Sequence, residues 1–372
     1  MATNVWRVAF GNCLTRTWAV YKVAYMSNHP DGPPKNFGDS LIAIFINDEK
    51  ELRSGWRVLL FFLAFTLAII LVSGIAETLE KLIPPLRFLA SKPQPDAPTA
   101  SRYLWLSLLI TQVETLAAAL IATFVCARWL ERRTLRSVGF KLHRGWLKDF
   151  AFGSLIGAAT LAFAVGLEAV ARAVQFSVQT TGAILLLRNF CYMLVFFLFA
   201  AAFEELMFRG FPLQALIHNL GGWTAISITS IFFGLAHYAN ANATWFSTIN
   251  TILAGAWLGT AYLLTRSLWL ATALHYSWNL VMAFVFGLPV SGITTFQNLA
   301  WLRGESKPPV WISGSDYGPE AGLAVTLVLL ISTLMIWKSG WFRPAAEMLA
   351  AIRHGKPERP LSITADDETL RA

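Results

Sequence analysis

The chain has 372 residues, of which 55% are hydrophobic and only 14% are charged, and its formal net charge is +8. A soluble globular domain carries roughly 25% charged residues, so this chain has more apolar sequence than one soluble core can bury. The composition and the three cysteines also exclude an intrinsically disordered chain, a disulfide-built secreted domain and a coiled coil. They predict an all-α, polytopic membrane protein.

Eight apolar runs follow one another along the chain. The hydrocarbon core of a bilayer is about 30 Å thick, and about 20 apolar helical residues are needed to cross it. Runs of roughly this kind cover residues 58–75, 103–127, 150–170, a stretch from 190 into 203–205, then 223–239, 246–264, 268–288 and 321–337. The sequence therefore predicts a bundle of about eight transmembrane helices.

Basic residues orient these runs. The densest basic loop follows the second run, between residues 128 and 148, and loops rich in lysine and arginine lie on the cytoplasmic side. Eight spans then place both termini in the cytoplasm and the loops 78–102 and 289–320 outside. In so apolar a chain the lysine and arginine side chains interact with anionic lipid head groups. We therefore expect membrane lipids as partners and no nucleic acid.

The termini differ in character from the apolar centre. Residues 1–50 form a polar N-terminal segment without the pattern of a cleaved signal peptide, and Met26 is an alternative start to Met1. Residues 51–345 are predicted to form the transmembrane domain. The polar residues 346–372 are expected to form a flexible cytoplasmic tail.

Ionisable residues inside apolar runs are the candidates for function. A charge at the bilayer centre costs roughly 2.5–3.5 kcal/mol on insertion scales, so such residues usually face the interior of the bundle. Glu204 and Glu205 lie together in the fourth run, and Arg209 follows Glu205 by four residues, which places both on one helical face. A salt-bridge cap at the cytoplasmic end of the helix is the structural alternative.

Two histidines and an asparagine on other runs complete a possible catalytic set. His237 lies late in the fifth run, four residues after Phe233, and His275 lies early in the seventh run, four residues before Asn279. A carboxylate can take a proton from water, imidazoles can hold that water or bind a metal, and a His–Asn pair can donate hydrogen bonds to an oxyanion. These residue types have the parts of a hydrolase, although a lone histidine in a helix is more often structural.

The length of the fourth helix decides whether these groups can meet. A helix rises 1.5 Å per residue, so an end at Gly210 would leave Glu204 too near the end of its helix to reach His237. We therefore expect the fourth helix to continue past Pro212 toward Leu216, with a kink at the proline. With a helix of this length, we expect Glu204 and His237 to lie within about 12 Å of each other.

Three motifs carry a resemblance to a known family. They are Glu-Glu-x-x-x-Arg at residues 204–209, Phe-x-x-x-His at 233–237 and His-x-x-x-Asn at 275–279. In this order and on separate runs, they resemble the CAAX-protease and bacteriocin-processing (CPBP) family of intramembrane endopeptidases, related to the eukaryotic Ras-converting enzyme. The resemblance covers about residues 130–290, and Gly-Pro-Glu at 318–320 also looks like bacterial members.

The resemblance implies a role for each catalytic candidate. Glu204 would be the general base that activates water, and His237 would position that water. His275 and Asn279 would stabilise the oxyanion. The implied enzyme is a CAAX-type intramembrane protease.

The resemblance also implies supporting residues around this set. Glu205 and Arg209 would form a structural or substrate-orienting pair, and Phe233 belongs to the same supporting group. Gly255 and Gly259 lie four residues apart on the sixth run, which predicts close packing against a neighbouring helix.

The metal requirement stays open at this point. Glu204, His237 and His275 could supply three zinc ligands and leave a fourth position for water. The sequence has no His-Glu-x-x-His pair, and Asn279 is a poor zinc ligand but a good oxyanion donor. We favour a mechanism without a metal or other cofactor, with divalent zinc as the alternative.

The predicted function is hydrolysis of peptide bonds in membrane-associated or lipidated protein and peptide substrates. The bacterial-looking features suggest a multi-pass protein of the bacterial inner membrane. The alternative is a non-catalytic membrane protein, such as a bacteriocin-immunity or scaffold protein, that uses the same bundle to bind a partner.

Overall fold

A computed structural model describes residues 44–47, 51–87 and 100–353. The chain divides into two units, Met1–Arg53 and Ser54–Ala372. In the first unit, Ile46 and Leu52 form an antiparallel bridge. The alternative start at Met26 and the greater part of the predicted N-terminal segment lie outside the described residues.

The second unit is built almost entirely of helices, because a backbone in lipid must satisfy its hydrogen bonds internally. Every predicted apolar run overlaps one of them. The helices are α3 (Ser54–Leu82), α5 (Ala100–Trp129), α6 (Trp146–Val170), α7 (Ala183–Arg209), α8 (Phe211–Leu220), α9 (Gly222–His237), α10 (Trp245–Thr265), α11 (Leu268–Leu280), α13 (Leu323–Ser339) and α14 (Ala346–Arg353). The short turns between them are named below where they matter.

The helices have the lengths that a membrane protein needs. Among the described residues, five segments are long and apolar enough to cross a bilayer: Ser54–Leu82, Tyr103–Trp129, Trp146–Val170, Ala183–Leu220 and Leu268–Val285. The all-α fold of a multi-pass membrane protein is therefore confirmed. The total of eight spans stays a prediction, since α9 and α13 are shorter and α10 is less apolar.

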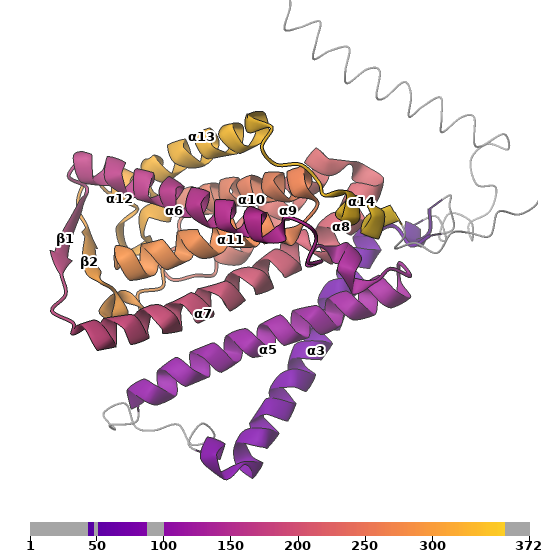
Figure 1. Ribbon diagram of the computed structural model, residues 1–372, viewed down its shortest axis with the longest axis horizontal. Coiled ribbons are helices and arrows are strands. Elements are labelled where there is room, and N and C mark those ends of the chain that lie inside the picture. The colour runs from indigo at the N-terminus through magenta and orange to yellow at the C-terminus, as the bar shows by residue number, and fades with distance from the viewer. Residues whose placement is uncertain (1–43, 48–50, 88–99, 354–372) are drawn as a thin grey trace, which may run out of the picture. The chain divides into compact units, whose positions relative to one another are not determined.

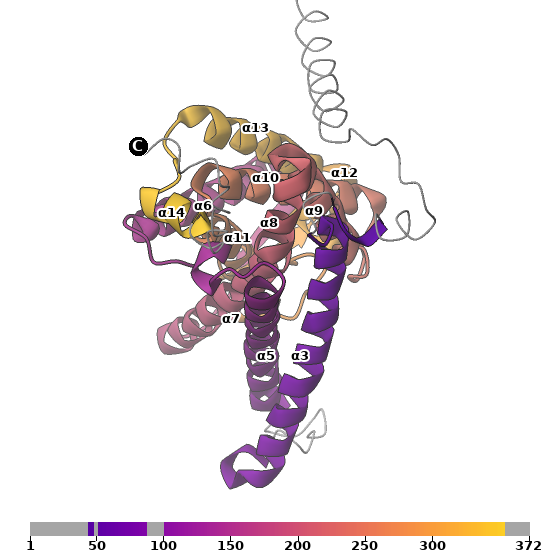
Figure 2. The same cartoon turned by 90° about the vertical axis from the view of Figure 1, so that its right-hand side faces the viewer.

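Helix α11 lies at the centre of the second unit. It packs against α6, α7 and α10, while α10 also packs against α9 and α13. Figure 1 shows α3 and α5 as a neighbouring pair beside α7, and Figure 2 shows the same bundle turned by 90°. Nearly all of α11 is buried, so its side chains are held in place from several directions.

A small antiparallel sheet joins two loops and was not predicted. Strand β1 (Val174–Val178) follows α6, and strand β2 (Leu302–Ser306) precedes α13, with Val174 opposite Ser306. Figure 1 shows the two strands at the end of the bundle away from α8. Each strand has only five residues and exists only because the other lies beside it, which the sequence pattern of either loop alone does not reveal.

Glycines allow α6 and α11 to approach closely. A Cβ added at Gly157 of α6 would lie 2.4 Å from the carbonyl oxygen of Leu274 on α11, and one at Gly153 would lie 2.9 Å from that of Leu270. Both distances are shorter than a carbon–oxygen contact permits. The absence of side chains at these two positions therefore sets how near α11 comes to α6.

The predicted small-residue face on the sixth run is confirmed as a packing face. A Cβ added at Gly255 of α10 would lie 2.9 Å from Cα of Ser230 on α9, and one at Gly259 would lie 2.9 Å from Cγ2 of Ile226 on the same helix. Helices α9 and α10 thus pack tightly along this face. Because α9 ends at His237, the packing also helps to fix that histidine.

The fourth run breaks at a glycine, although a kink at proline was expected. Helix α7 ends at Arg209, Gly210 has φ −71° and ψ −123°, and α8 begins directly at Phe211. Pro212 lies in the first turn of α8, where its missing N–H leaves no helical hydrogen bond unmade. The chain is therefore helical past Leu216 as predicted, but as a second helix, and the proline starts it.

The C-terminal tail begins with a helix. The tail was expected to be flexible from residue 346, but α14 covers Ala346–Arg353 and the side chain of Met348 is fully buried. The Glu347 carboxylate accepts a hydrogen bond from the backbone N–H of Arg144, which follows α5 in the chain. Burial of an apolar side chain and this contact explain the helix; residues 354–372 lie outside the described part.

We expect Gly157→Ala to lower the free energy of unfolding by about 1–3 kcal/mol, because the added methyl group overpacks the contact with α11. Gly166 lies in the same helix, and a Cβ there meets no atom within 4 Å. Gly166→Ala should therefore leave stability unchanged or raise it slightly, since alanine favours a helix. Thermal unfolding of the detergent-solubilised variants measures both effects. Equal melting temperatures would contradict the proposed close packing.

Candidate active site

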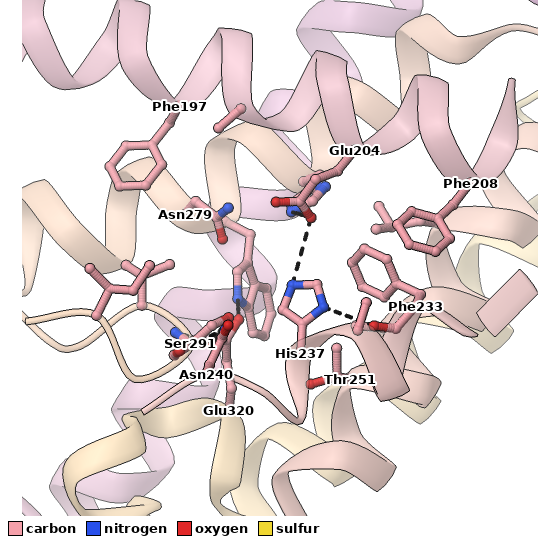
Figure 3. A pocket seen from close by; sticks show the side chains of 18 of the residues that line it. Phe197, Glu204, Phe208, Phe233, His237, Asn240, Thr251, Asn279, Ser291 and Glu320 are labelled. Atoms are coloured by element: carbon pink, nitrogen blue, oxygen red, sulfur yellow. Dashed lines mark hydrogen bonds and ion pairs between the residues drawn. The ribbon is translucent and has the colours of Figure 1, made fainter. Parts of the chain in front are cut away.

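A cavity of about 430 Å³ lies between α7, α9, α10, α11 and the turns before α13. Its walls are mostly apolar, with a few polar side chains that converge on the space, as is typical of binding sites. The four predicted catalytic residues, Glu204, His237, His275 and Asn279, all line it. Figure 3 shows the interior of this cavity. Residues far apart in the sequence therefore meet in one place.

Glu204 projects from α7 into the cavity and faces both histidines. Its Oε2 atom lies 3.7 Å from Nε2 of His237 and 3.7 Å from Nε2 of His275. These atoms are much closer than the 12 Å limit derived from the sequence. The Oε2 atom has no hydrogen-bond partner among the described residues. It is thus a buried acceptor that is free to receive a proton or a hydrogen bond.

His237 is held at the end of α9 in a defined tautomer. Its Nδ1 atom lies 2.8 Å from the carbonyl oxygen of Phe233, one turn earlier. A carbonyl oxygen can only accept, so Nδ1 carries the hydrogen and donates it. In the neutral ring Nε2 is then an acceptor, and it is the atom that faces Glu204 (Figure 3).

His275 is held from behind by a buried ion pair. Its Nδ1 donates to Oε1 of Glu205 at 2.9 Å, and Nη1 of Arg209 donates to the same oxygen at 3.0 Å. Nη2 of Arg209 donates to the carbonyl oxygen of Gly255 on α10. The side chains of Glu205 and Arg209 have no exposed surface, which favours a structural role for this pair over contact with a substrate.

Phe233 fills the space between the ion pair and the histidines. Its ring lies 4.4 Å from the guanidinium carbon of Arg209 and 4.6 Å from the ring centre of His237. The Arg209 contact is a cation–π interaction, which is stronger when both partners are buried. Phe233 therefore contacts both Arg209 of the Glu-Glu-x-x-x-Arg motif and His237 of its own Phe-x-x-x-His motif.

Asn279 lies one turn after His275 on α11, and its side chain is almost fully buried. Figure 3 shows it next to Glu204 at the cavity wall. Directly after it, residues Val281–Val285 form a π-helical turn. Such turns often occur at functional sites because they change which side chains share a helix face. The amide is placed where it could donate to a group that reacts beside Glu204.

A second polar group in the cavity was not predicted as part of the site. Glu320 was noted only within the Gly-Pro-Glu motif, without a role. Its carboxylate accepts hydrogen bonds from Nε1 of Trp278 at 3.1 Å and from the backbone N–H and the hydroxyl of Ser291 at 2.6 and 2.8 Å. Asn240 lines the same wall and donates to the carbonyl oxygen of Ser291.

The sequence held weak signals for these additional residues. Asn240 follows the motif histidine His237 by three residues, and Trp278 directly precedes Asn279. Neither spacing predicts that Glu320, 41 residues after Asn279 in the chain, joins them. That contact depends on how the loop before α13 folds back over the cavity.

The described side chains do not form a metal site as they stand. Among them, no group of three His, Cys, Asp or Glu residues has an arrangement that could hold a metal ion. The sequence suggested three zinc ligands, which are Glu204, His237 and His275. Their side chains face one another but do not form such a metal-binding group. We therefore derive no reaction step through a metal.

The comparison with protein families agrees with the motifs. A family described as type II CAAX prenyl endopeptidase Rce1-like matches residues 186–281, which include all three motifs. The resemblance predicted from the motifs is thus confirmed, and it supports a protease, a hydrolase of peptide bonds, at this general level. No curated protein and no solved structure matches the chain.

We expect Arg209→Met to destabilise the protein by about 3–5 kcal/mol, because it leaves the buried charge of Glu205 without a partner. The double variant Glu205→Leu with Arg209→Met should recover part of this loss, since it removes both charges. Lys81→Met breaks an exposed pair with Glu77 and should change little. Thermal unfolding distinguishes the three. A double variant that is less stable than Arg209→Met alone would contradict this explanation.

Proposed function

We propose that the chain is an intramembrane endopeptidase that acts on membrane-associated or lipidated protein and peptide substrates. The observation that supports this most directly is the unpartnered Oε2 of Glu204, which lies 3.7 Å from two imidazole nitrogens inside a cavity. The family description names a CAAX prenyl endopeptidase. It supports peptides that carry a lipid near the cleaved bond as one substrate class.

The proposed nucleophile is a water molecule between Glu204 and His237. Oε2 of Glu204 and Nε2 of neutral His237 are both acceptors, so they repel each other unless a donor lies between them. Water supplies two O–H groups and fits this need. As the water attacks a peptide carbonyl, one proton passes to Glu204, which acts as general base, and His237 holds the other hydrogen in position.

The oxyanion of the tetrahedral intermediate is stabilised in this mechanism by Asn279 and His275. The Asn279 amide donates one hydrogen bond. His275 donates from Nε2 when it carries two hydrogens, because Nδ1 is already bound to Glu205. The charges of Glu204 and Glu205 then balance those of Arg209 and His275. These four groups therefore add no net charge to the cavity, which lowers the cost of placing them in a membrane.

Collapse of the intermediate completes the proposed reaction. The C–N bond breaks, and Glu204 returns its proton to the leaving nitrogen, which departs as an amine. The new carboxyl group leaves with the other product, and a second water restores the resting site. No group besides water is consumed, so the reaction is a simple hydrolysis in which Glu204 serves first as base and then as acid.

The proposed location is the bacterial inner membrane, with both termini in the cytoplasm. The basic loop between α5 and α6 supports this orientation, because lysine- and arginine-rich loops stay on the cytoplasmic side. The β1–β2 sheet and the loop that carries Glu320 would then lie toward the opposite face.

The alternative function is a non-catalytic protein that binds a partner with the same bundle. It requires the fold but not the chemistry of Glu204. Full burial and mutual pairing of Glu205 and Arg209 would serve either function. The position of Glu204 favours the enzyme, because its Oε2 atom faces two imidazole nitrogens inside a cavity that could admit a substrate.

We expect Glu204→Gln to reduce cleavage by about 10²–10⁴-fold, the range typical for loss of a general base. Terminal-peptide mass spectrometry of membranes from matched strains that express either form measures the loss of new termini. Glu305→Gln, an exposed carboxylate on β2 that pairs with Lys307, is the matched control and should keep full activity. New termini that persist in Glu204→Gln would support the partner-binding alternative.

We expect cleavage to survive prolonged treatment with a strong chelator, because the proposed steps use only protein groups and water. Elemental analysis of the purified protein, combined with an assay before and after chelation, provides the measurement. Stoichiometric zinc whose removal abolishes cleavage and whose return restores it would contradict the metal-free mechanism and favour Glu204, His237 and His275 as ligands.

A further inference from the structure

The cavity holds a second carboxylate whose charge the described residues do not neutralise. Both oxygens of Glu320 accept hydrogen bonds, one from Trp278 and the other from Ser291. All these donors are uncharged. No described Lys, Arg or His forms an ion pair with Glu320, and none of the described residues that line the cavity is a lysine or an arginine.

The hydrogen bonds leave Glu320 with capacity for one more donor. A carboxylate offers about four acceptor positions, and three are used. Nearby, Asn240 donates one N–H to the carbonyl oxygen of Ser291, and its side chain is also hydrogen-bonded to Tyr317, so it holds this wall of the cavity in place. Trp278 adds an aromatic wall. Acceptors, a negative charge and an aromatic face together suit a cation.

Tyr317 interacts electrostatically with the carboxylate of Glu320. Burial and the negative charge of Glu320 raise the pKa of this phenol to about 12. It therefore stays neutral at physiological pH and supplies no positive charge to the cluster. The motif arginine, Arg209, is fully buried, is paired with Glu205 and does not line the cavity.

We propose that Glu320, Asn240 and Trp278 form a specificity subsite for a basic side chain, lysine or arginine, of the peptide substrate. The subsite lies in the same cavity as Glu204, at a different wall (Figure 3). The basic residue therefore lies at a fixed place relative to the cleaved bond. This inference rests on the proposed function, because it names a feature of the same substrate.

Electrostatics inside an apolar cavity makes such a subsite selective. Opposite charges attract more strongly there than in water, because the surroundings screen them less. An apolar side chain gains nothing from Glu320, a neutral donor gains only a hydrogen bond without the charge attraction, and an acidic side chain is repelled by Glu320 and Glu204 together. The three hydrogen bonds from Trp278 and Ser291 hold the carboxylate still, so little conformational freedom is lost when the substrate binds.

The first experiment maps cleavage sites. Terminal-peptide mass spectrometry of membranes with wild-type protein and with Glu204→Gln identifies the bonds whose cleavage depends on Glu204. We expect lysine or arginine to be enriched at one position relative to these bonds. Glu204-dependent cleavage without such enrichment would overturn the subsite but leave the proposed function intact. No Glu204-dependent cleavage would overturn both.

The second experiment measures selectivity with synthetic peptides. One peptide copies a mapped site with lysine at the enriched position, and its partner has norleucine there. We expect the lysine peptide to have a kcat/KM about 10- to 100-fold higher, the range of a hydrogen bond to a charged group. Glu320→Gln should bring the ratio close to one, mainly through the KM of the lysine peptide. Glu305→Gln should keep the wild-type ratio.

A purely structural role for Glu320 gives a different result. If the carboxylate only ties Trp278 to Ser291, Glu320→Gln slows both peptides by the same factor, and the proposal is overturned. If that variant does not fold, the wild-type protein still decides the question with an acetyl-lysine peptide, which keeps the methylene chain and one N–H but not the charge. Cleavage of this peptide as fast as the lysine peptide would overturn the subsite.

Discussion

The buried pair of Glu205 and Arg209 is the interaction on which the site depends. Neither side chain reaches solvent, so either charge alone would be very costly in a membrane. Arg209 also donates to the Gly255 carbonyl oxygen of α10, and Glu205 accepts from His275 of α11. One ion pair therefore joins α7, α10 and α11, and the requirement that it stay intact fixes three helices relative to one another.

Two adjacent glutamates have opposite environments because of helical geometry. Neighbouring residues on a helix point about 100° apart, so Glu205 faces the packed helices while Glu204 faces the cavity. Glu205 is neutralised by Arg209, whereas the Oε2 of Glu204 has no hydrogen-bond partner among the described residues and faces two imidazoles. The same dipeptide thus supplies both a structural anchor and the proposed general base, and the anchor holds His275 opposite Glu204.

The cavity wall that carries Glu320 is built from a different part of the chain. The family match ends at residue 281, whereas Ser291 and Glu320 come from the loops between α11 and α13. These loops close over the end of α11 through the bond from Trp278 to Glu320. The residues of the proposed chemistry are therefore encoded within the matched segment, and those of the proposed subsite other than Asn240 and Trp278 lie in the segment that follows it.

The sequence alone determined the features that depend on local periodicity. Apolar runs of about 20 residues become helices because lipid offers the backbone no other hydrogen-bond partners, and a spacing of four residues places His237 near Phe233 and Arg209 near Glu205. The tertiary structure alone decided the break at Gly210, the β1–β2 pairing and the place of Glu320. Each of these three features depends on contacts between residues far apart in the chain or on backbone angles that packing imposes. The spacing of nearby residues predicts neither those contacts nor those angles.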